Sequence, residues 1–189
     1  MMNAIRDNPA TLVLGIGNLL LTDEGAGIHL LRYLMAHYPD LPDVRFLDGG
    51  TLGFTLAASI GQSERLIVLD AAELGAAPGT VRMFEGEAMD RQLGGAGLSV
   101  HEVGLADLMD MARLGGQLPE RRALVGIQPQ TIADWGELPT GPVAAALPEA
   151  AEAVAAIVAR WREETGSFAG SAEENVERDQ NNGPQIFRQ

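Results

Sequence analysis

The chain lacks both cysteine and lysine, and each absence removes a class of chemistry. Its 189 residues contain no cysteine, which excludes disulfides, thiolate zinc sites, iron–sulfur clusters and a cysteine nucleophile. All 13 basic residues are arginine, so a Walker A loop, Schiff-base chemistry and Ser–Lys hydrolysis are excluded as well. Carboxylates, three histidines, arginines, hydroxyls and backbone amides are left to carry any chemistry.

Positive charge is scarce as well. The 13 arginines face 26 acidic residues, which gives a formal net charge of −13. That charge opposes binding to nucleic acid or to anionic lipid, because both depend on basic side chains. Residues 1–10 contain no apolar segment typical of a secretory signal, and the longest apolar runs, such as 153–159, are too short to span a bilayer. We therefore expect a cytoplasmic protein with neither nucleic-acid nor membrane partners.

Aromatic residues make up only 5% of the chain, but hydrophobic residues reach 46%, which is enough to build one ordinary domain. We expect a loose N-terminal lead-in over 1–10 and a single α/β domain over 11–165. The remaining segment, 166–189, is polar, contains Gly, Asn and Pro, and has few apolar residues. It is expected to be a disordered tail.

Short apolar runs alternate with segments of helical periodicity. This pattern predicts a three-layer α/β sandwich, in which a twisted, mainly parallel sheet has helices on both faces. The expected parallel strands are 11–16, 44–47, 66–69 and 123–127, with 80–84 as an antiparallel edge strand. The expected helices are 26–38, 51–60, 105–114 and 142–163, the last bent or divided at Pro148. Because such sheets bind ligands at the carboxyl ends of their strands, the residues that follow strands are the most informative.

Three carboxylates fall at or just after these strand ends. Asp48 and Asp70 each end a predicted strand, and Glu24 lies in the loop after the first strand. Each acid alone has an ordinary explanation, since a strand-end aspartate caps turns and an acid in a first helical turn meets the positive end of the helix dipole. All three share one edge if the sheet is parallel, which favours a site there.

Among the three histidines, His101 is the candidate for chemistry. It follows a Gly-rich stretch and precedes a helix, which suits a ligand or a proton carrier. His29 is expected to be solvated on its helix, and His37 lies at the frayed end of the same helix. With Glu24 and Asp70, His101 gives two carboxylates and one imidazole, a set that suits a borderline divalent metal.

Two other motifs are weaker. The G-x-G at Gly15–Gly17 begins like a dinucleotide fingerprint, but Leu20 stands at the third glycine position, and two acids follow where a pyrophosphate would bind. The segment around Ser59 faintly resembles a nucleophile elbow, yet it falls inside a helical pattern. A nucleotide-binding protein and a serine hydrolase are therefore disfavoured.

Five motifs in order carry a family resemblance: GIGNLLLTDEGAG, LDGGTLG, LIVLDA, SVHEVGLAD and LVGIQP. Over roughly Thr11 to Arg162 the chain resembles the [NiFe]-hydrogenase maturation endopeptidases. The resemblance implies a cytoplasmic endopeptidase that removes a C-terminal extension from the precursor of the hydrogenase large subunit, once nickel has been inserted. It implies metal-binding roles for Glu24, Asp70 and His101, and it places the aspartate of the family's D-G-G-T motif at Asp48.

The resemblance also implies that nickel arrives with the precursor and that no organic cofactor is needed. Glu24, Asp70 and His101 would complete the coordination of that nickel, and together with Asp48 they form the expected catalytic set. The attack on the scissile carbonyl is open between a metal-polarised water and Asp48 as general base, that is, between a metal-dependent and an aspartyl-type endopeptidase. A non-catalytic, nickel-sensing escort protein of hydrogenase assembly is the alternative function, and a monomer is the working expectation.

Overall fold

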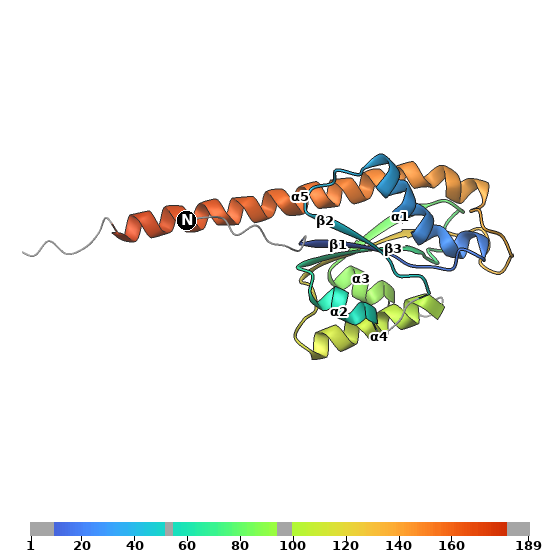
Figure 1. The fold of residues 1–189 in the computed structure, drawn as a ribbon, viewed down its shortest axis with the longest axis horizontal. Coiled ribbons are helices and arrows are strands. Elements are labelled where there is room, and N and C mark those ends of the chain that lie inside the picture. Colours follow the sequence, from blue (N-terminus) through green and yellow to red (C-terminus); the bar gives the residue numbers. More distant parts are fainter. Residues whose placement is uncertain (1–9, 52–54, 94–99, 181–189) are drawn as a thin grey trace, which may run out of the picture. The chain divides into compact units, whose positions relative to one another are not determined.

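The computed structural model describes the backbone of residues 10–51, 55–93 and 100–180, and the side chains in these ranges except those of 55, 100–103 and 166–180. One five-stranded sheet, in the order β2-β1-β3-β5-β4, forms the centre of the fold (Figure 1). The strands are β1 (Thr11–Gly15), β2 (Val44–Asp48), β3 (Arg65–Ala71), β4 (Val81–Glu85) and β5 (Arg121–Ile127). The helices are η1 (Thr22–Gly25), α1 (Ala26–His37), α2 (Thr55–Gly61), α3 (Glu87–Leu93), α4 (Val100–Leu114) and α5 (Gly141–Gln180).

The sheet is parallel except at one edge. β1 pairs in parallel with β2 and β3, and β3 with β5, whereas β4 runs antiparallel to β5. The predicted fold class and the antiparallel edge strand are therefore confirmed. Gly15 is in register with Asp48 on one side and with Leu69 on the other, so the carboxyl ends of three neighbouring strands lie at the same edge.

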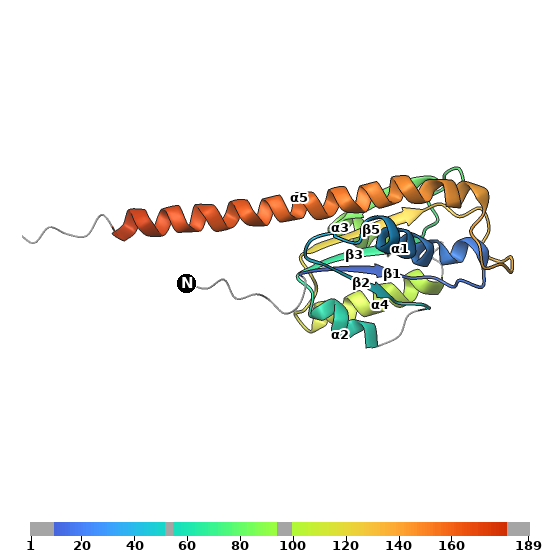
Figure 2. The same ribbon diagram turned by 45° about the horizontal axis from the view of Figure 1, so that its top comes forward.

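Helices cover both faces of the sheet (Figures 1 and 2). Helices α2, α3 and α4 lie on one face, and α1 lies on the other with residues 141–155 of α5. Alternation along the strands decides which side chains meet which layer, because successive strand residues point to opposite faces. Leu66 and Val68 of β3 thus join the apolar cluster that packs against Met89 of α3 and Leu105 of α4.

Three helices differ from the sequence prediction. Helix α4 begins at Val100 and not at residue 105, so His101, expected in the loop before the helix, lies within it. The short helix α3 was not predicted, because seven residues with two acids and one arginine show too little apolar periodicity. Helix α5 is one element that contains Pro148, and it extends to Gln180. Residues 166–180, expected in a disordered tail, are therefore helical, since a helix already formed extends cheaply through residues such as Ala, Glu and Arg. Residues 181–189 lie outside the described part of the chain.

The chain divides into two compact units, Met1–Ala155 and Ala156–Gln189, so the boundary predicted after residue 165 falls inside α5. By length and composition alone, Gly141–Thr165 is apolar enough to cross a membrane, a test that buried core helices also pass. Within the first unit, α5 buries Val143, Ala146, Ala150 and Val154. Their spacing of three to four residues is typical of an amphipathic helix with one face in a protein core.

Helix α3 is fixed to β5 by an ion pair. Arg122 donates to both carboxylate oxygens of Asp90, with Nε–Oδ1 at 2.9 Å and Nη2–Oδ2 at 2.6 Å, and Arg113 adds a bond from Nη2 at 3.2 Å. The hydrogen bond from Arg122 is the largest cause that lowers the pKa of Asp90 below its ordinary value of 3.8. This pair fixes the helix that precedes the segment leading to His101.

We expect Asp90→Asn to lower the free energy of unfolding at pH 7 by about 1–2 kcal/mol, because charge-assisted bonds from two arginines are lost. Since folding lowers the pKa of Asp90, its contribution is present above pH 3.8 and disappears as the pH falls through the folded value. Urea unfolding at pH 7, 5 and 3 measures this. Asp107→Asn, at an exposed position, is the control. If the difference in unfolding free energy between Asp90→Asn and wild type is as large at pH 3 as at pH 7, the ionised Asp90 carboxylate is not its source.

Candidate active site

The loop after β1 is held tightly against the carboxyl edge of the sheet. The backbone N–H of Ile16 donates to Leu69 O at 3.0 Å, which ties the end of β1 to the end of β3. The first turn of helix α1 packs against these strand ends. A Cβ added to Gly27 would lie 2.1 Å from Leu69 O and 2.4 Å from Ile16 O, so only glycine allows the helix to approach this closely. Glu24, three residues earlier in η1, is thereby placed at the ends of β1 and β3.

Asp70 lies at the same edge, next to last in β3. Its side chain is 1% exposed, and its Oδ2 is a buried atom. By alternation, Asp70 shares a face with Leu66 and Val68, the face covered by α4. Glu24 is half-buried, and its Oε2 is also a buried atom. Two carboxylates therefore lie at the edge where β1 and β3 end, Asp70 from β3 itself and Glu24 from η1 in the loop after β1.

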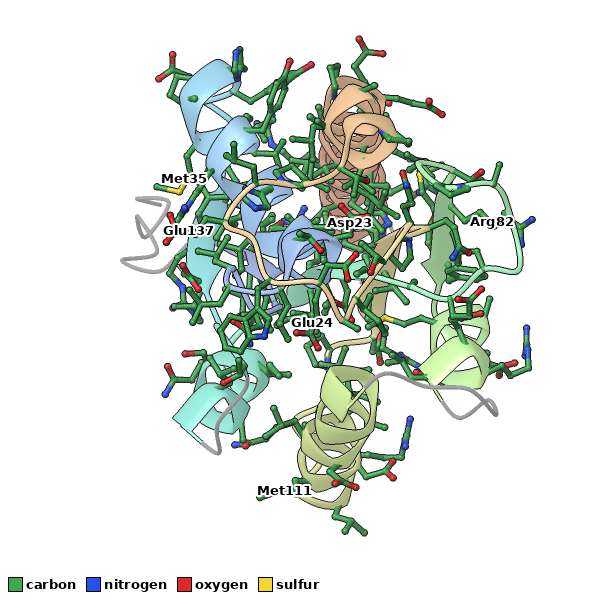
Figure 3. All side chains as sticks on the ribbon, turned by 90° about the vertical axis from the view of Figure 1, so that its right-hand side faces the viewer. Asp23, Glu24, Met35, Arg82, Met111 and Glu137 are labelled. Atoms are coloured by element: carbon green, nitrogen blue, oxygen red, sulfur yellow. The ribbon has the colours of Figure 1, made fainter. Side chains whose placement is uncertain are left out.

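His101 is the second residue of α4. Because α4 leads into β5, which is parallel to β3, it runs against the strands and begins at their carboxyl edge (Figure 1). Figure 3 looks onto this edge and places Glu24 toward the near end of α4 and Asp23 toward α5. The structure thus brings the backbone of His101 to the edge that holds Glu24 and Asp70; the His101 side chain lies outside the described residues.

This edge is the topological switch point of the sheet. From β1 the chain moves first to β2 on one side and then to β3 on the other, and open α/β sheets bind ligands where the order reverses in this way. Among the described side chains, which do not include that of His101, no three His, Asp or Glu residues form a group that could hold a metal ion. The set of three metal ligands therefore stays a prediction.

Asp48 stands apart from Asp70. Its neighbour Leu47 packs against the cluster under α4, so alternation puts Asp48 on the opposite face of the sheet from Asp70. Asp48 is exposed, and its Oδ1 accepts a hydrogen bond from Gly50 N at 2.9 Å. This is the turn-capping role that its position in the sequence favours. A catalytic role for Asp48 stays a prediction.

Asp23 has a role that sequence reasoning missed. Its position in the first helical turn suggests only an interaction with the helix dipole, yet its side chain is fully buried. Both carboxylate oxygens accept hydrogen bonds from a segment more than 100 residues away in the sequence. The donors are Gln130 N (2.8 Å), Thr131 N (3.3 Å), Thr140 N (2.6 Å) and Thr140 Oγ1 (2.8 Å). Asp23 therefore holds the loop after β5 against the loop that carries Glu24.

Backbone bonds strengthen the same connection. Thr22 N donates to Gly136 O at 2.8 Å, and Gly136 N donates to Leu20 O at 3.0 Å. At the other end of the loop, the buried Gln128 accepts bonds through Oε1 from Leu74 N at 2.7 Å and from Ala76 N at 3.3 Å. Residues 128–140 are thus joined to the loops that follow both β1 and β3. Gln128 lies in the LVGIQP motif and Leu20 and Thr22 lie in GIGNLLLTDEGAG, but neither motif indicates these contacts.

We expect Asp23→Asn to lower the free energy of unfolding by about 2–3 kcal/mol, because the amide NH₂ would face backbone donors and leave buried N–H groups unsatisfied. The loop over 128–140 should then be cut faster by proteases. Urea unfolding and limited proteolysis with peptide mapping measure the two effects. Asp134→Asn, at an exposed position of the same loop, is the control. Unchanged stability and cutting in Asp23→Asn would show that the carboxylate does not hold the loop.

His29 is not solvated as the sequence suggested. Its ring is half-buried, and Nε2 is a buried atom with no hydrogen-bond partner among the described residues. Burial lowers the pKa of His29, the charge of Arg32 lowers it further, and Asp23 opposes both. The helical pattern failed here only at the start of α1, because Arg32 and Ala36 on the same face are exposed as predicted. His37 is exposed at the helix end, as expected, and its Nδ1 lies 2.9 Å from Tyr33 O.

Fold and site together define a three-layer α/β protein with paired acids at the switch point of its sheet. Residues 28–157 match the family model described as hydrogenase maturation protease, and the chain belongs to that family. It is 37% identical over 153 residues to the hydrogenase expression/formation protein HupD of Rhizobium leguminosarum bv. viciae, covering 81% of this chain and 76% of that protein. It is 38% identical over 123 residues to the hydrogenase 2 maturation protease of Escherichia coli K12, covering 64% of this chain and 74% of that protein.

Solved structures agree with this assignment. The hydrogenase maturating endopeptidase HybD from Escherichia coli superposes with a TM-score of 0.70 at 33% identity, covering 82% of this chain and 93% of that one. The [NiFe] hydrogenase maturation protease HybD from Thermococcus kodakarensis superposes with a TM-score of 0.67 at 28% identity, covering 78% of this chain and 98% of that one. The family and the enzyme class predicted from five motifs are confirmed: the chain is a hydrogenase maturation endopeptidase. Nickel recognition and the roles of individual residues stay predictions.

Proposed function

We propose that this endopeptidase removes the C-terminal extension from the nickel-loaded precursor of a hydrogenase large subunit, and that it does so in the cytoplasm. The proposal is supported by the placement of η1, which carries Glu24, the end of β3, which carries Asp70, and the start of α4, which carries His101, at one edge of the sheet. Family membership supplies the reaction class.

Nickel enters this proposal as part of the substrate. Glu24, Asp70 and His101 would add two carboxylates and one imidazole to a nickel ion that the precursor already holds, and such ligands suit a borderline divalent metal. Recognition then acts as a checkpoint, because a precursor without nickel offers these side chains no ion to bind. Binding the ion also brings the nearby C-terminal extension to the sheet edge, which favours cleavage by proximity.

The peptide bond is broken by addition of water. The water oxygen bonds to the carbonyl carbon, a base takes the proton, and the C–N bond breaks as the leaving amine is protonated. A water polarised by the metal is one source of the nucleophile, and Asp48 as general base is the other. Because Asp48 lies on the opposite face from Asp70, the second route requires the scissile peptide to run across the sheet edge, past the end of β1.

The test is a trimming assay on the full-length precursor, prepared with and without nickel. Mass spectrometry should show loss of a C-terminal peptide from the loaded precursor alone. Equal cleavage of both forms would contradict the nickel checkpoint. An intact precursor mass in a stable complex would instead support the escort function and overturn the assignment of this substrate.

A further inference from the structure

Four large apolar side chains are exposed on the two loops that Asp23 holds together. They belong to Leu20 (51% exposed), Ile132 (45%), Trp135 (82%) and Leu138 (76%). We call these four residues the Trp135 patch. A scattered exposed leucine is ordinary, but a tryptophan exposed to this extent among three further apolar side chains is typical of a surface that meets another molecule.

The Trp135 patch is built on a fixed scaffold. Leu20 lies next to the Leu21–Gly136 bridge between the loops, and Trp135 lies next to its other end. Two backbone hydrogen bonds form this bridge, and the buried carboxylate of Asp23 accepts a hydrogen bond from Thr140 N, two residues beyond Leu138. A loop backbone held in place before binding loses less conformational entropy when a partner covers the loop. The fixed backbone of these two loops therefore suits the Trp135 patch to binding another protein.

The position of the patch identifies its occupant. Leu20 is four residues before Glu24, and the loop that carries Trp135 is hydrogen-bonded to the same segment. The body of a protein whose scissile peptide reaches Glu24 would therefore lie near the segment that carries this patch. Negative charge lies beside the patch, because Asp134 and Glu137 are exposed on the same loop. Figure 3 labels Glu137. A matching surface on the partner would be apolar and bordered by basic side chains.

We propose that the Trp135 patch docks the folded body of the nickel-loaded large-subunit precursor, separately from the site that receives its nickel and its extension. This inference rests on the proposed function. Docking of this kind would let the enzyme select the folded, loaded protein over a free peptide. Tryptophan at the centre of an interface commonly supplies a large share of the binding energy.

The experiment compares Trp135→Ala and Leu138→Ala with wild type, using the full-length nickel-loaded precursor as the probe. We expect Kd and KM for the precursor to rise at least about tenfold in Trp135→Ala, and Trp135→Phe to recover most of the loss. The matched control is Leu114→Ala, a residue 89% exposed at the far end of α4, which should bind and trim as wild type does. Thermal unfolding confirms that each variant is folded.

The outcomes separate this inference from the proposed function. If wild type trims the precursor and Trp135→Ala and Leu138→Ala bind it with unchanged Kd, the docking surface is wrong and the proposed function stands. If wild type neither binds nor trims the precursor, both are wrong. The alternative occupant is a second copy of this chain, which analytical sedimentation tests. If wild type is a dimer and Trp135→Ala is a monomer, the patch is a dimer interface and docking of the precursor is wrong.

Discussion

Glu24→Gln and Asp70→Asn should each reduce trimming of the nickel-loaded precursor by at least about a hundredfold while the protein stays folded. Both substitutions keep the shape of the side chain and remove its negative charge. An amide is a weaker ligand for nickel than a carboxylate, and misplacing the substrate by about 1 Å already costs about a hundredfold. Single-turnover cleavage followed by mass spectrometry measures the effect.

Binding data make this prediction more specific. If Glu24 and Asp70 recognise nickel, each variant should also lose the preference of wild type for loaded over empty precursor. His101→Ala should behave in the same way, and Asp48→Asn should reduce kcat only if Asp48 is the general base. Asp107→Asn serves as the control, because Asp107 is an exposed acid on α4. Folded Glu24→Gln and Asp70→Asn that trim at the wild-type rate would show that neither carboxylate takes part.

The sheet was predictable because its strands contain short apolar runs, such as residues 12–14, 66–69 and 123–125. Every residue of β3 is buried, and a strand covered on both faces must be apolar along nearly its whole length. Helix α3 was not predictable in this way, since only Met89 and Leu93 are buried in it. The course of α5 beyond residue 165 escaped prediction because polar composition alone does not stop a helix that has already formed.

The candidate site also has parts that the sequence predicts and parts that it does not. The placement of Glu24 and Asp70 at one sheet edge was predictable, because Glu24 follows β1, Asp70 is next to last in β3, and parallel strands bring their carboxyl ends to one edge. The role of Asp23 was not, because the donors that satisfy its carboxylate lie 107 to 117 residues away, in a loop without regular structure. The exposure of Trp135 has the same origin, since it depends on how that loop packs. The local sequence pattern identifies the candidate acids, but only contacts between distant residues show that Asp23 is the acid that holds the loop over 128–140.

The closest packing at this edge leads to the largest expected effect on stability. Gly27→Ala would place a Cβ 2.1 Å from Leu69 O and 2.4 Å from Ile16 O, both backbone atoms that cannot turn aside as a flexible side chain can. Alanine normally stabilises a helix by about 1 kcal/mol over glycine. Here the start of α1 must move away from the sheet, so we expect a loss of about 3 kcal/mol or more in the free energy of unfolding.

Gly141→Ala is the matched control, because no heavy atom of the described residues lies within 4 Å of the added Cβ at this first residue of α5. It should be neutral or slightly stabilising in urea unfolding. In Gly27→Ala, the same displacement of α1 also moves Glu24, so trimming should fall further than the folded fraction does. A variant as stable as wild type would mean that α1 does not contact the ends of β1 and β3, and Glu24 would then lose the support that places it beside Asp70.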